Sequence, residues 1–221
     1  MSFIEFLTQN LGHVLPILVA GALGLAIILE RITLLYSFYS LKNIDGFYED
    51  LTQKITHGKM SEAIQRCDQE SRVPLCQVVK SGLCRAHLPE VMIEDGLRIA
   101  THQAQSLVQK RIGYLATIAN VSTLLGLFGT ILGLIHSFEA VGHADAQQKS
   151  ALLSAGISTA MNATLLGLGV AIPCMIAYSF LVNRANQLTS QIEDASLKTM
   201  DLLKQRFYST VDSPTEDRKI A

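Results

Sequence analysis

The 221-residue sequence lacks the motifs from which common catalytic and metal sites are built. Its four cysteines form no Cys-x-x-Cys pair or other metal-ligand spacing, so we expect reduced thiols. Its six histidines are scattered, and no Gly-x-Ser-x-Gly element, His-Glu-x-x-His motif or phosphate-binding glycine loop occurs. We therefore expect no enzyme activity, no metal site and no cofactor.

Charge is also scarce. Only 17% of the residues are charged, the formal net charge is −1, and the basic residues form no cluster. This pattern argues against nucleic-acid binding. In contrast, 49% of the residues are hydrophobic, which is high for a soluble chain with so little charge. The composition predicts an integral membrane protein in contact with the lipid bilayer.

Three apolar stretches are long enough to cross a bilayer, which needs about 20 residues. We predict an all-α integral membrane protein with transmembrane helices over 14–36, 113–141 and 151–183, the second and third being long and extending into a helical cytoplasmic domain. Residues 1–13 contain no Lys or Arg, unlike the basic start of a cleaved signal peptide, so we expect the first span to be retained.

Lys and Arg are unevenly distributed around these spans. Ten lie in 37–111 and six from Arg184 onward, whereas 1–13 has none and 142–150 has only Lys149. The positive-inside rule then places the N-terminus (1–13) and the short loop 142–150 outside, on the side of the membrane away from the cytoplasm. The same rule places region 37–112 and a C-terminal helix over 184–210 in the cytoplasm.

The cytoplasmic region is predicted to be helical. We expect helices near 44–57, ended by Gly58, near 61–70, and after Pro74. The final stretch, 211–221, is polar and contains Pro214, so we expect a disordered tail.

No proline occurs between Pro89 and Pro173, so we predict one continuous helix from Pro89 to about Val141. Its part before the membrane carries an apolar stripe: Ile93, Leu97, Ala100, Ala104 and Leu107. After the third span, apolar residues recur in alternating fours and threes, which predicts a packing seam within the chain or between subunits: Leu181, Ala185, Leu188, Ile192, Ala195, Thr199 and Leu202.

Small and hydroxyl-bearing residues follow one face of the second span. They are Ala119, Thr123, Gly126, Thr130, Gly133 and Ser137. Glycines let helix backbones approach closely in lipid, and Gly129-x-x-x-Gly133 has the small-xxx-small spacing that favours this. We therefore predict helix packing at Gly126, Gly129 and Gly133, and at Gly167 in the third span.

Polar residues inside the spans need a partner or a function. Thr130, Thr159 and Thr164 can each bond a backbone carbonyl of the preceding turn, so a purely structural role is one alternative. The Asn162 amide needs either an interhelical contact or a water-filled cavity. All four are candidates for lining an ion pathway.

Acidic and basic side chains are absent from the deep part of every span. Glu30 and Arg31 lie near the end of the first span, where an interfacial ion pair or headgroup anchor is expected. His136 and Glu139, near the outer end of the second, are a possible entrance or are simply solvated. Pro173 is predicted to be a hinge of the third span. Proton transfer through a buried carboxylate would need an acid from another chain.

Three stretches resemble the ExbB/TolQ/MotA family of ion-channel subunits, in its ExbB/TolQ branch. They are ILERI at 28–32, LLGLFGTILGLIHSF at 124–138 and AGISTAMNATLLGLGVAIPCMIAYSF at 155–180. The resemblance implies a homo-oligomer, a pentamer, around a smaller ExbD/TolR-like partner whose single span carries an ion-binding aspartate. It also implies a location in the bacterial inner membrane, with the outer segments 1–13 and 142–150 in the periplasm. The expected function is coupling of the proton motive force to work on the cell envelope, without enzymatic activity.

The family's pore threonines fall on Thr130 of GLFGT and Thr164 of AT-x-x-GL. The family pattern places a glutamate where this chain has Thr159, which is the main departure. Hydroxyl and amide oxygens can coordinate sodium, so Thr130, Thr159, Asn162 and Thr164 are compatible with transport of Na⁺ as well as H⁺.

Two other functions stay open on the sequence. One is the stator of a gliding or other specialised motor. A flagellar stator is disfavoured, because its subunit usually has four spans and this chain has three. The other is a structural membrane scaffold whose small residues serve only assembly.

Overall fold

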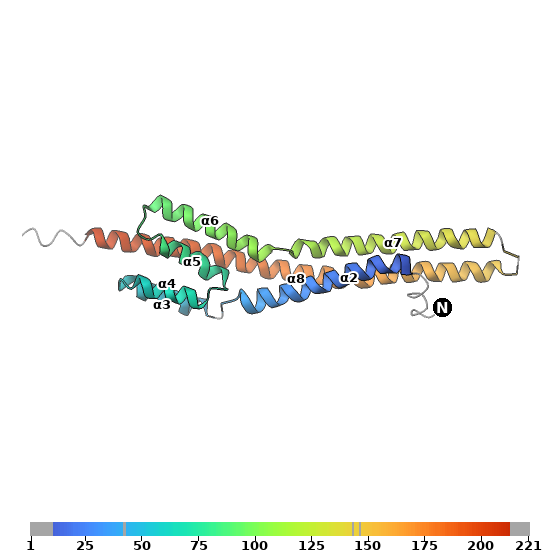
Figure 1. Ribbon diagram of the computed structural model, residues 1–221, viewed down its shortest axis with the longest axis horizontal. Helices are drawn as coiled ribbons and strands as arrows, with labels where there is room; N and C mark the ends of the chain where they lie inside the picture. Colours follow the sequence, from blue (N-terminus) through green and yellow to red (C-terminus); the bar gives the residue numbers. More distant parts are fainter. Residues whose placement is uncertain (1–10, 42, 143, 146, 213–221) are drawn as a thin grey trace, which may run out of the picture. The chain divides into compact units, whose positions relative to one another are not determined.

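The computed structural model describes residues 11–41, 43–142, 144–145 and 147–212. Within these ranges the chain contains helices and no strand, which confirms the predicted all-α class (Figure 1). The helices are α2 (Leu11–Ile32), the π-helical η1 (Thr33–Phe38), α3 (Ile44–Thr56), α4 (Met60–Gln69), α5 (Pro74–Cys84), α6 (Glu90–Gln109), α7 (Ile112–Gly142) and α8 (Lys149–Asp212).

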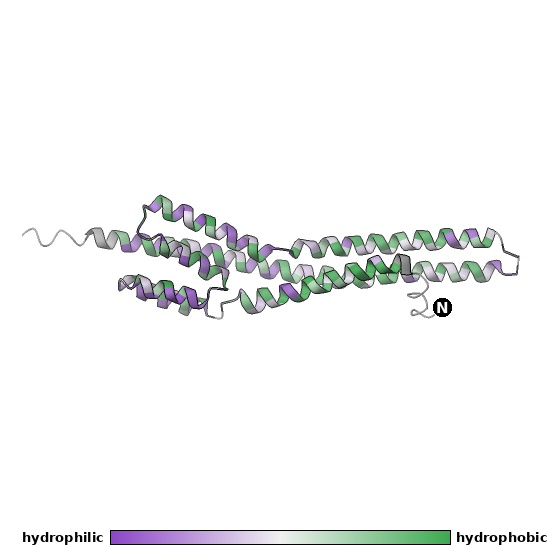
Figure 2. Cartoon of the chain, viewed as in Figure 1, coloured by the Kyte–Doolittle hydropathy of each residue, from purple (hydrophilic) through white to green (hydrophobic). Residues whose placement is uncertain are grey.

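Three helical segments are long and apolar enough to cross a membrane: Val14–Phe38, Glu90–Gly142 and Lys149–Phe207. Apolar residues concentrate along α2, α7 and the first part of α8, whereas α3 to α6 are more hydrophilic (Figure 2). Most of the predicted outer segment 1–13 and of the predicted tail 211–221 lies outside the described residues.

The chain divides into two compact units. We call the first, which contains the described residues 11–31 and 111–182, the membrane unit. The second, which contains 32–110 and the chain from Asn183 onward, is called the polar unit. Helix α8 contributes to both.

The membrane unit is held together by close contact between α7 and α8. A Cβ atom added at Gly126 would lie 3.2 Å from the Ala163 carbonyl oxygen and 3.2 Å from the Gly167 Cα. A Cβ at Gly167 would lie 2.6 Å from the Ser122 carbonyl oxygen. Because these obstacles are backbone atoms, they cannot rotate away, and only glycine allows this approach.

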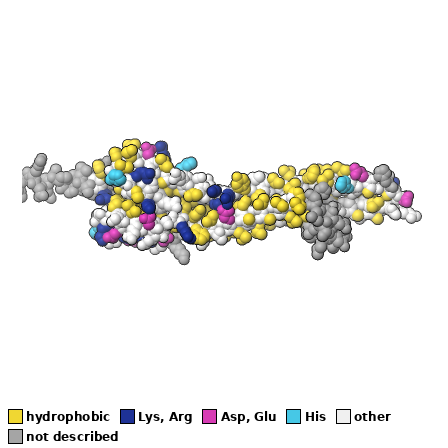
Figure 3. Space-filling view, viewed as in Figure 1, with side chains coloured by type: hydrophobic (Ala, Val, Ile, Leu, Met, Phe, Trp, Pro, Cys, Tyr) yellow, Lys and Arg dark blue, Asp and Glu magenta, His cyan; other side chains and the backbone are white. Residues whose placement is uncertain are grey.

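The outward surface of the membrane unit is apolar. Large side chains such as Leu23, Leu124 and Met161 are 56%, 64% and 68% exposed. Hydrophobic side chains cover much of the visible face of this unit (Figure 3). A surface of this kind is suited to lipid or to other membrane helices.

The predicted continuous helix from Pro89 to Val141 is wrong. Helix α6 ends at Gln109 and α7 begins at Ile112. Between them Lys110 has an extended ψ of 134°, and Arg111 has a left-handed φ of 63°. These angles do not allow the helix to continue, so it is interrupted at this point.

Local signals explain the helix ends of the polar unit. The Asn43 side chain accepts a hydrogen bond from the Gly46 N–H at 3.0 Å and caps α3. Gly58, just after α3, has a φ of +76°, which glycine adopts without strain. Pro74 occupies the first turn of α5, where its missing N–H costs nothing.

The predicted seam of α8 begins at Leu181 in the membrane unit, and from Ala185 onward it contributes to the core of the polar unit. All but one of its positions are buried, with Ala195 and Thr199 fully so. The exception is the last, where Leu203 is buried instead of Leu202. On α6 the stripe similarly ends at Val108, while Leu107 is 40% exposed. Each shift is one residue, which a helix of 3.6 residues per turn produces over a long stripe.

Candidate functional site

Helix α2 packs along one side of the α7–α8 pair. A Cβ atom at Gly24 of α2 would lie 2.7 Å from the Cys174 sulfur of α8 and 3.4 Å from the Ile118 Cγ2 of α7. A Cβ at Gly21 would lie 3.0 Å from Val170 on α8. Ile118 and Val170 therefore mark the side of each helix that faces α2.

Thr130 and Thr164 lie on the other side of this pair. At about 100° per residue, Thr130 is about 120° around α7 from Ile118, and Gly126, which faces α8, lies between them. Thr164 is likewise about 120° around α8 from Val170, and Gly167, which faces α7, lies between them. We call this side of the α7–α8 pair, opposite α2, the threonine side.

The two threonines also lie at neighbouring levels along the helices. The Cβ position at Gly126 is 3.4 Å from the Thr164 Cα. Gly129, the neighbour of Thr130, has its Cβ position 2.8 Å from the Ala163 Cβ, and Ala163 is the neighbour of Thr164. The structure thus brings Thr130 and Thr164 together on one side of the membrane unit.

The Thr130 hydroxyl donates a hydrogen bond of 2.6 Å to the Leu127 carbonyl. Its oxygen keeps lone pairs that can accept from water or bind a cation. Both Thr130 and Thr164 are partly exposed. Backbone bonding and an ion-lining role are therefore compatible at Thr130.

Thr159 and Asn162 lie elsewhere on α8. Thr159 is about 20° around the helix from Val170, which faces α2, and Asn162 is about 80° from it, away from Thr164. The Thr159 hydroxyl donates to the Ala155 carbonyl at 3.0 Å. Within a single chain, the three candidates on α8 therefore do not share one side of that helix, and only Thr164 lies on the same side as Thr130 of α7.

The helix-packing candidates all lie where α7 meets α8. Beside Gly126, Gly129 and Gly167, the Cβ position at Gly133 is 3.3 Å from Ala160. Sequence reasoning missed Gly156, whose Cβ would overlap the Ser137 side chain. The spacing of four between Gly156 and Ala160, continued in Ala163 and Gly167, was the available signal.

The remaining candidates lie at exposed positions. Pro173 is exposed within α8, which continues as helix on both sides of it. His136 and Glu139 are exposed on the last turns of α7, next to the loop that leads to α8.

A charged cluster lies where α2 ends and α7 begins. Arg31 is buried, with 2% exposure, and donates to Glu30 at 3.1 Å. One Arg111 nitrogen contacts both Glu30 oxygens, at 2.8 and 3.0 Å. The ion pair expected for Glu30 and Arg31 is confirmed, and Arg111, 81 residues away in sequence, joins it.

The deep, membrane-spanning parts of the membrane unit contain no Asp, Glu, Lys or Arg. Neither 112–138 in α7 nor 150–182 in α8 contains Asp, Glu, Lys or Arg, and the same holds for 11–29 in α2. Thr130 and Thr164 thus offer hydroxyls, and no charge, on the threonine side.

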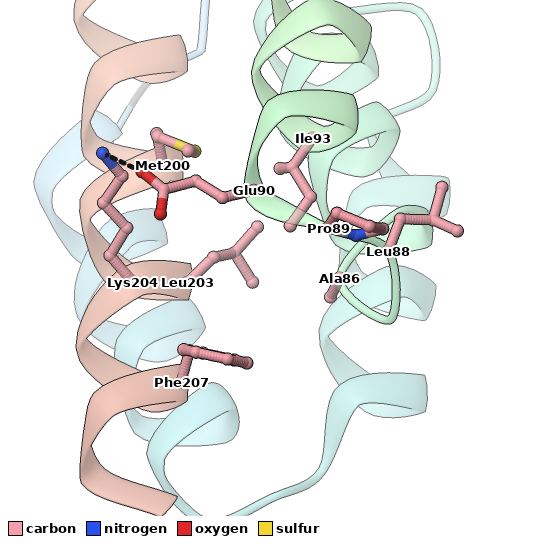
Figure 4. A pocket seen from close by; sticks show the side chains of 9 residues that line it. All are labelled: Ala86, Leu88, Pro89, Glu90, Ile93, Met200, Leu203, Lys204 and Phe207. Carbon is pink, nitrogen blue, oxygen red and sulfur yellow. Dashed lines mark ion pairs between the residues drawn. The ribbon is translucent and has the colours of Figure 1, made fainter. Parts of the chain in front are cut away.

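The polar unit contains a separate cavity of about 90 Å³ between the start of α6 and the last turns of α8. Its lining is mainly apolar, with an ion pair of 2.6 Å between Lys204 and Glu90 at its edge (Figure 4). Among the described residues no group of three His, Cys, Asp or Glu side chains could hold a metal ion.

All four cysteines are free. In the polar unit, burial raises the pKa of Cys67 and that of Cys76 to about 12. These two thiols therefore stay protonated at neutral pH, which makes them unsuited to metal binding or nucleophilic chemistry.

A family model and several known proteins match parts of the chain. Residues 70–194 match the model of the MotA/TolQ/ExbB proton channel family. The chain is 30% identical over 154 residues to the Tol-Pal system protein TolQ of Haemophilus influenzae, covering 68% of this chain and 64% of that protein.

Two further relatives are named after ExbB. A putative biopolymer transport protein ExbB homolog of Methanothermobacter thermautotrophicus is 30% identical, over 82% of this chain and 64% of that protein. The putative biopolymer transport protein ExbB-like 3 of a Synechocystis species is 30% identical, over 88% of this chain and 95% of its own length. The chain thus spans just under two thirds of the first two relatives and nearly all of the third.

Proposed function

Because the chain belongs to the MotA/TolQ/ExbB proton channel family, we propose that it is the channel subunit of an inner-membrane energy-transducing complex. In this proposal several copies, five by analogy with the family, surround a single-span partner resembling ExbD or TolR. Ion flow along the interface with the partner drives work on the cell envelope.

One observation carries the proposal: the hydroxyl-bearing Thr130 and Thr164 lie together on one side of helices whose deep, membrane-spanning parts contain no Asp, Glu, Lys or Arg. A threonine hydroxyl does not exchange its proton at neutral pH, but it can order water and accept hydrogen bonds. The protonatable acid must then come from another chain, which is why the partner is expected to carry a carboxylate in its span. Thr130 and Thr164 line the passage beside that acid.

The proposed orientation follows from the distribution of Lys and Arg. The N-terminus and the α7–α8 loop lie in the periplasm, and the polar unit lies in the cytoplasm. His136 and Glu139 are then at the periplasmic entrance, and the cluster of Glu30, Arg31 and Arg111 is at the cytoplasmic boundary.

The proposal is tested by expressing the chain with the single-span protein encoded beside it and weighing the intact complex by native mass spectrometry. We expect several copies of this chain with fewer of the partner. Purification of the chain without any such partner, in a complete and stable oligomer, contradicts the partnership.

The role of the threonines is tested in proteoliposomes with an imposed ion gradient. Thr130→Val and Thr164→Val keep side-chain shape but remove the hydroxyl, so we expect intact assembly and flux reduced about tenfold or more, as when a buried hydrogen-bonding partner is lost. Unchanged flux in both variants contradicts the channel and favours the scaffold.

A further inference from the structure

A third hydroxyl follows Thr130 and Thr164 on the threonine side. Thr123 precedes Thr130 by seven residues, so the two lie about 20° apart around α7 and about 10 Å apart along it. Thr123 is about 140° around α7 from Ile118, and Gly126, which faces α8, lies between them. It therefore shares a side with Thr130 and not with α2.

The contacts between α7 and α8 give the order of the three hydroxyls. The Cβ position of Gly126 adjoins the Thr164 Cα at 3.4 Å, and the Ser122 carbonyl adjoins the Cβ position of Gly167 at 2.6 Å. Thr123, next to Ser122, therefore lies one turn nearer the α6 end than Thr164. Thr130, Thr164 and Thr123 alternate between the two helices in that order.

Large apolar side chains flank this row. Leu127 on α7 and Leu168 and Met175 on α8 are 54%, 39% and 46% exposed. Thr123 is itself exposed, and its hydroxyl donates to the Ala119 carbonyl at 3.0 Å. The bond to Ala119 fixes the donor, and the oxygen is left to accept from water. A chain of waters leaving Thr164 toward the α6 end therefore meets its next acceptor at Thr123.

We propose that Thr123 is a further residue of the ion pathway, which carries water or a hydrated ion between Thr164 and the cytoplasmic end of α7. The proposal rests on the proposed channel function, and it adds a position outside the family's two pore threonines. It also assigns the cytoplasmic half of the pathway to α7.

The test compares the same substitution at two positions of one helix. Thr123→Val removes the hydroxyl on the threonine side, and Thr117→Val removes one about 120° away around α7, at an exposed position. In the complex with the single-span partner, reconstituted in proteoliposomes, we expect flux about fivefold lower for Thr123→Val, the size expected for one lost hydrogen bond. Thr123→Ser, which keeps the hydroxyl, restores flux, and Thr117→Val leaves it unchanged.

The outcomes separate this inference from the channel proposal. Lowered flux in Thr130→Val with normal flux in Thr123→Val overturns the role of Thr123 and leaves the channel intact. Normal flux in both Thr130→Val and Thr164→Val overturns the channel itself.

A second measurement covers the case in which Thr123→Val does not assemble. Thr123→Cys and Thr117→Cys are treated in the intact complex with a water-soluble, membrane-impermeant thiol reagent, and peptide mass spectrometry locates the label. Labelling at position 123 and not at 117 is expected if water reaches the threonine side. Absence of label at 123 overturns the inference.

Discussion

At the scale of single residues, the glycines of α8 differ in how much space there is beside them for a side chain. Gly167 meets the backbone of α7, whereas the Cβ position at Gly169, two residues on, has nothing within 4 Å. We predict that Gly167→Val destabilises the protein by about 1–3 kcal/mol, the usual cost of overpacking. Gly169→Val is the matched control, because the β-branched side chain has the same helix propensity at both positions.

Thermal unfolding of the purified protein in detergent measures this difference. We expect a clearly lower midpoint for Gly167→Val than for Gly169→Val. Equal midpoints would mean that α7 and α8 do not approach each other at Gly167 as closely as described.

At the candidate site, some residue positions can be predicted from the sequence and others cannot. Thr130 and Thr164 stand out because each lies in a short family motif, and the structure brings them to one side. Thr159 and Asn162 were grouped with them because all four are polar residues in lipid. The side on which a residue lies depends on which neighbour covers the helix, and Val170 meets α2 through Gly21, a contact between segments far apart in sequence.

At the scale of elements, most helices follow from local signals. Asn43, Gly58 and Pro74 mark helix ends in the sequence, and the seam of α8 follows from its periodicity. The break between α6 and α7 does not, because Lys110 and Arg111 are good helix formers. A tertiary interaction, the ion pair of Arg111 with Glu30, accompanies the left-handed backbone there. Helix propensity describes the local sequence, and it does not include the effect of a partner 81 residues away.

The break between α6 and α7 predicts which of two Arg111 variants is more stable, because the order depends on the backbone conformation at that residue. Arg111→Gly and Arg111→Ala both remove the ion pair with Glu30. At a φ of 63° glycine is unstrained and alanine is not, so we expect the glycine variant to be more stable by about 1 kcal/mol. In a continuous helix the order would be reversed, with alanine more stable by about 1 kcal/mol.

Chemical denaturation of the two variants, side by side in the same detergent, distinguishes these cases. If the alanine variant is the more stable one, the result supports the single long helix that the sequence predicts. The comparison does not depend on the strength of the ion pair, since both variants lack it.

At the scale of the whole molecule, the distribution of polar groups determines which ion the complex can use. A dehydrated hard cation is held by several oxygen ligands that converge on one point, about six in the sites of Ca²⁺ and Mg²⁺. One chain offers Thr130 and Thr164 on the threonine side, while Thr159 and Asn162 lie around α8 from them. Hydroxyls in a row, without converging ligands, are suited to ordered water, along which protons can move.

We therefore predict that the complex uses protons and that sodium is not required. Flux in proteoliposomes should persist when all sodium is replaced by potassium or choline, and it should collapse when a protonophore dissipates the pH gradient. Flux that instead follows the sodium gradient and survives the protonophore would contradict proton transport. It would also imply that Thr159 and Asn162 of one subunit converge with Thr130 and Thr164 of a neighbouring subunit, because a single chain does not bring these oxygens together.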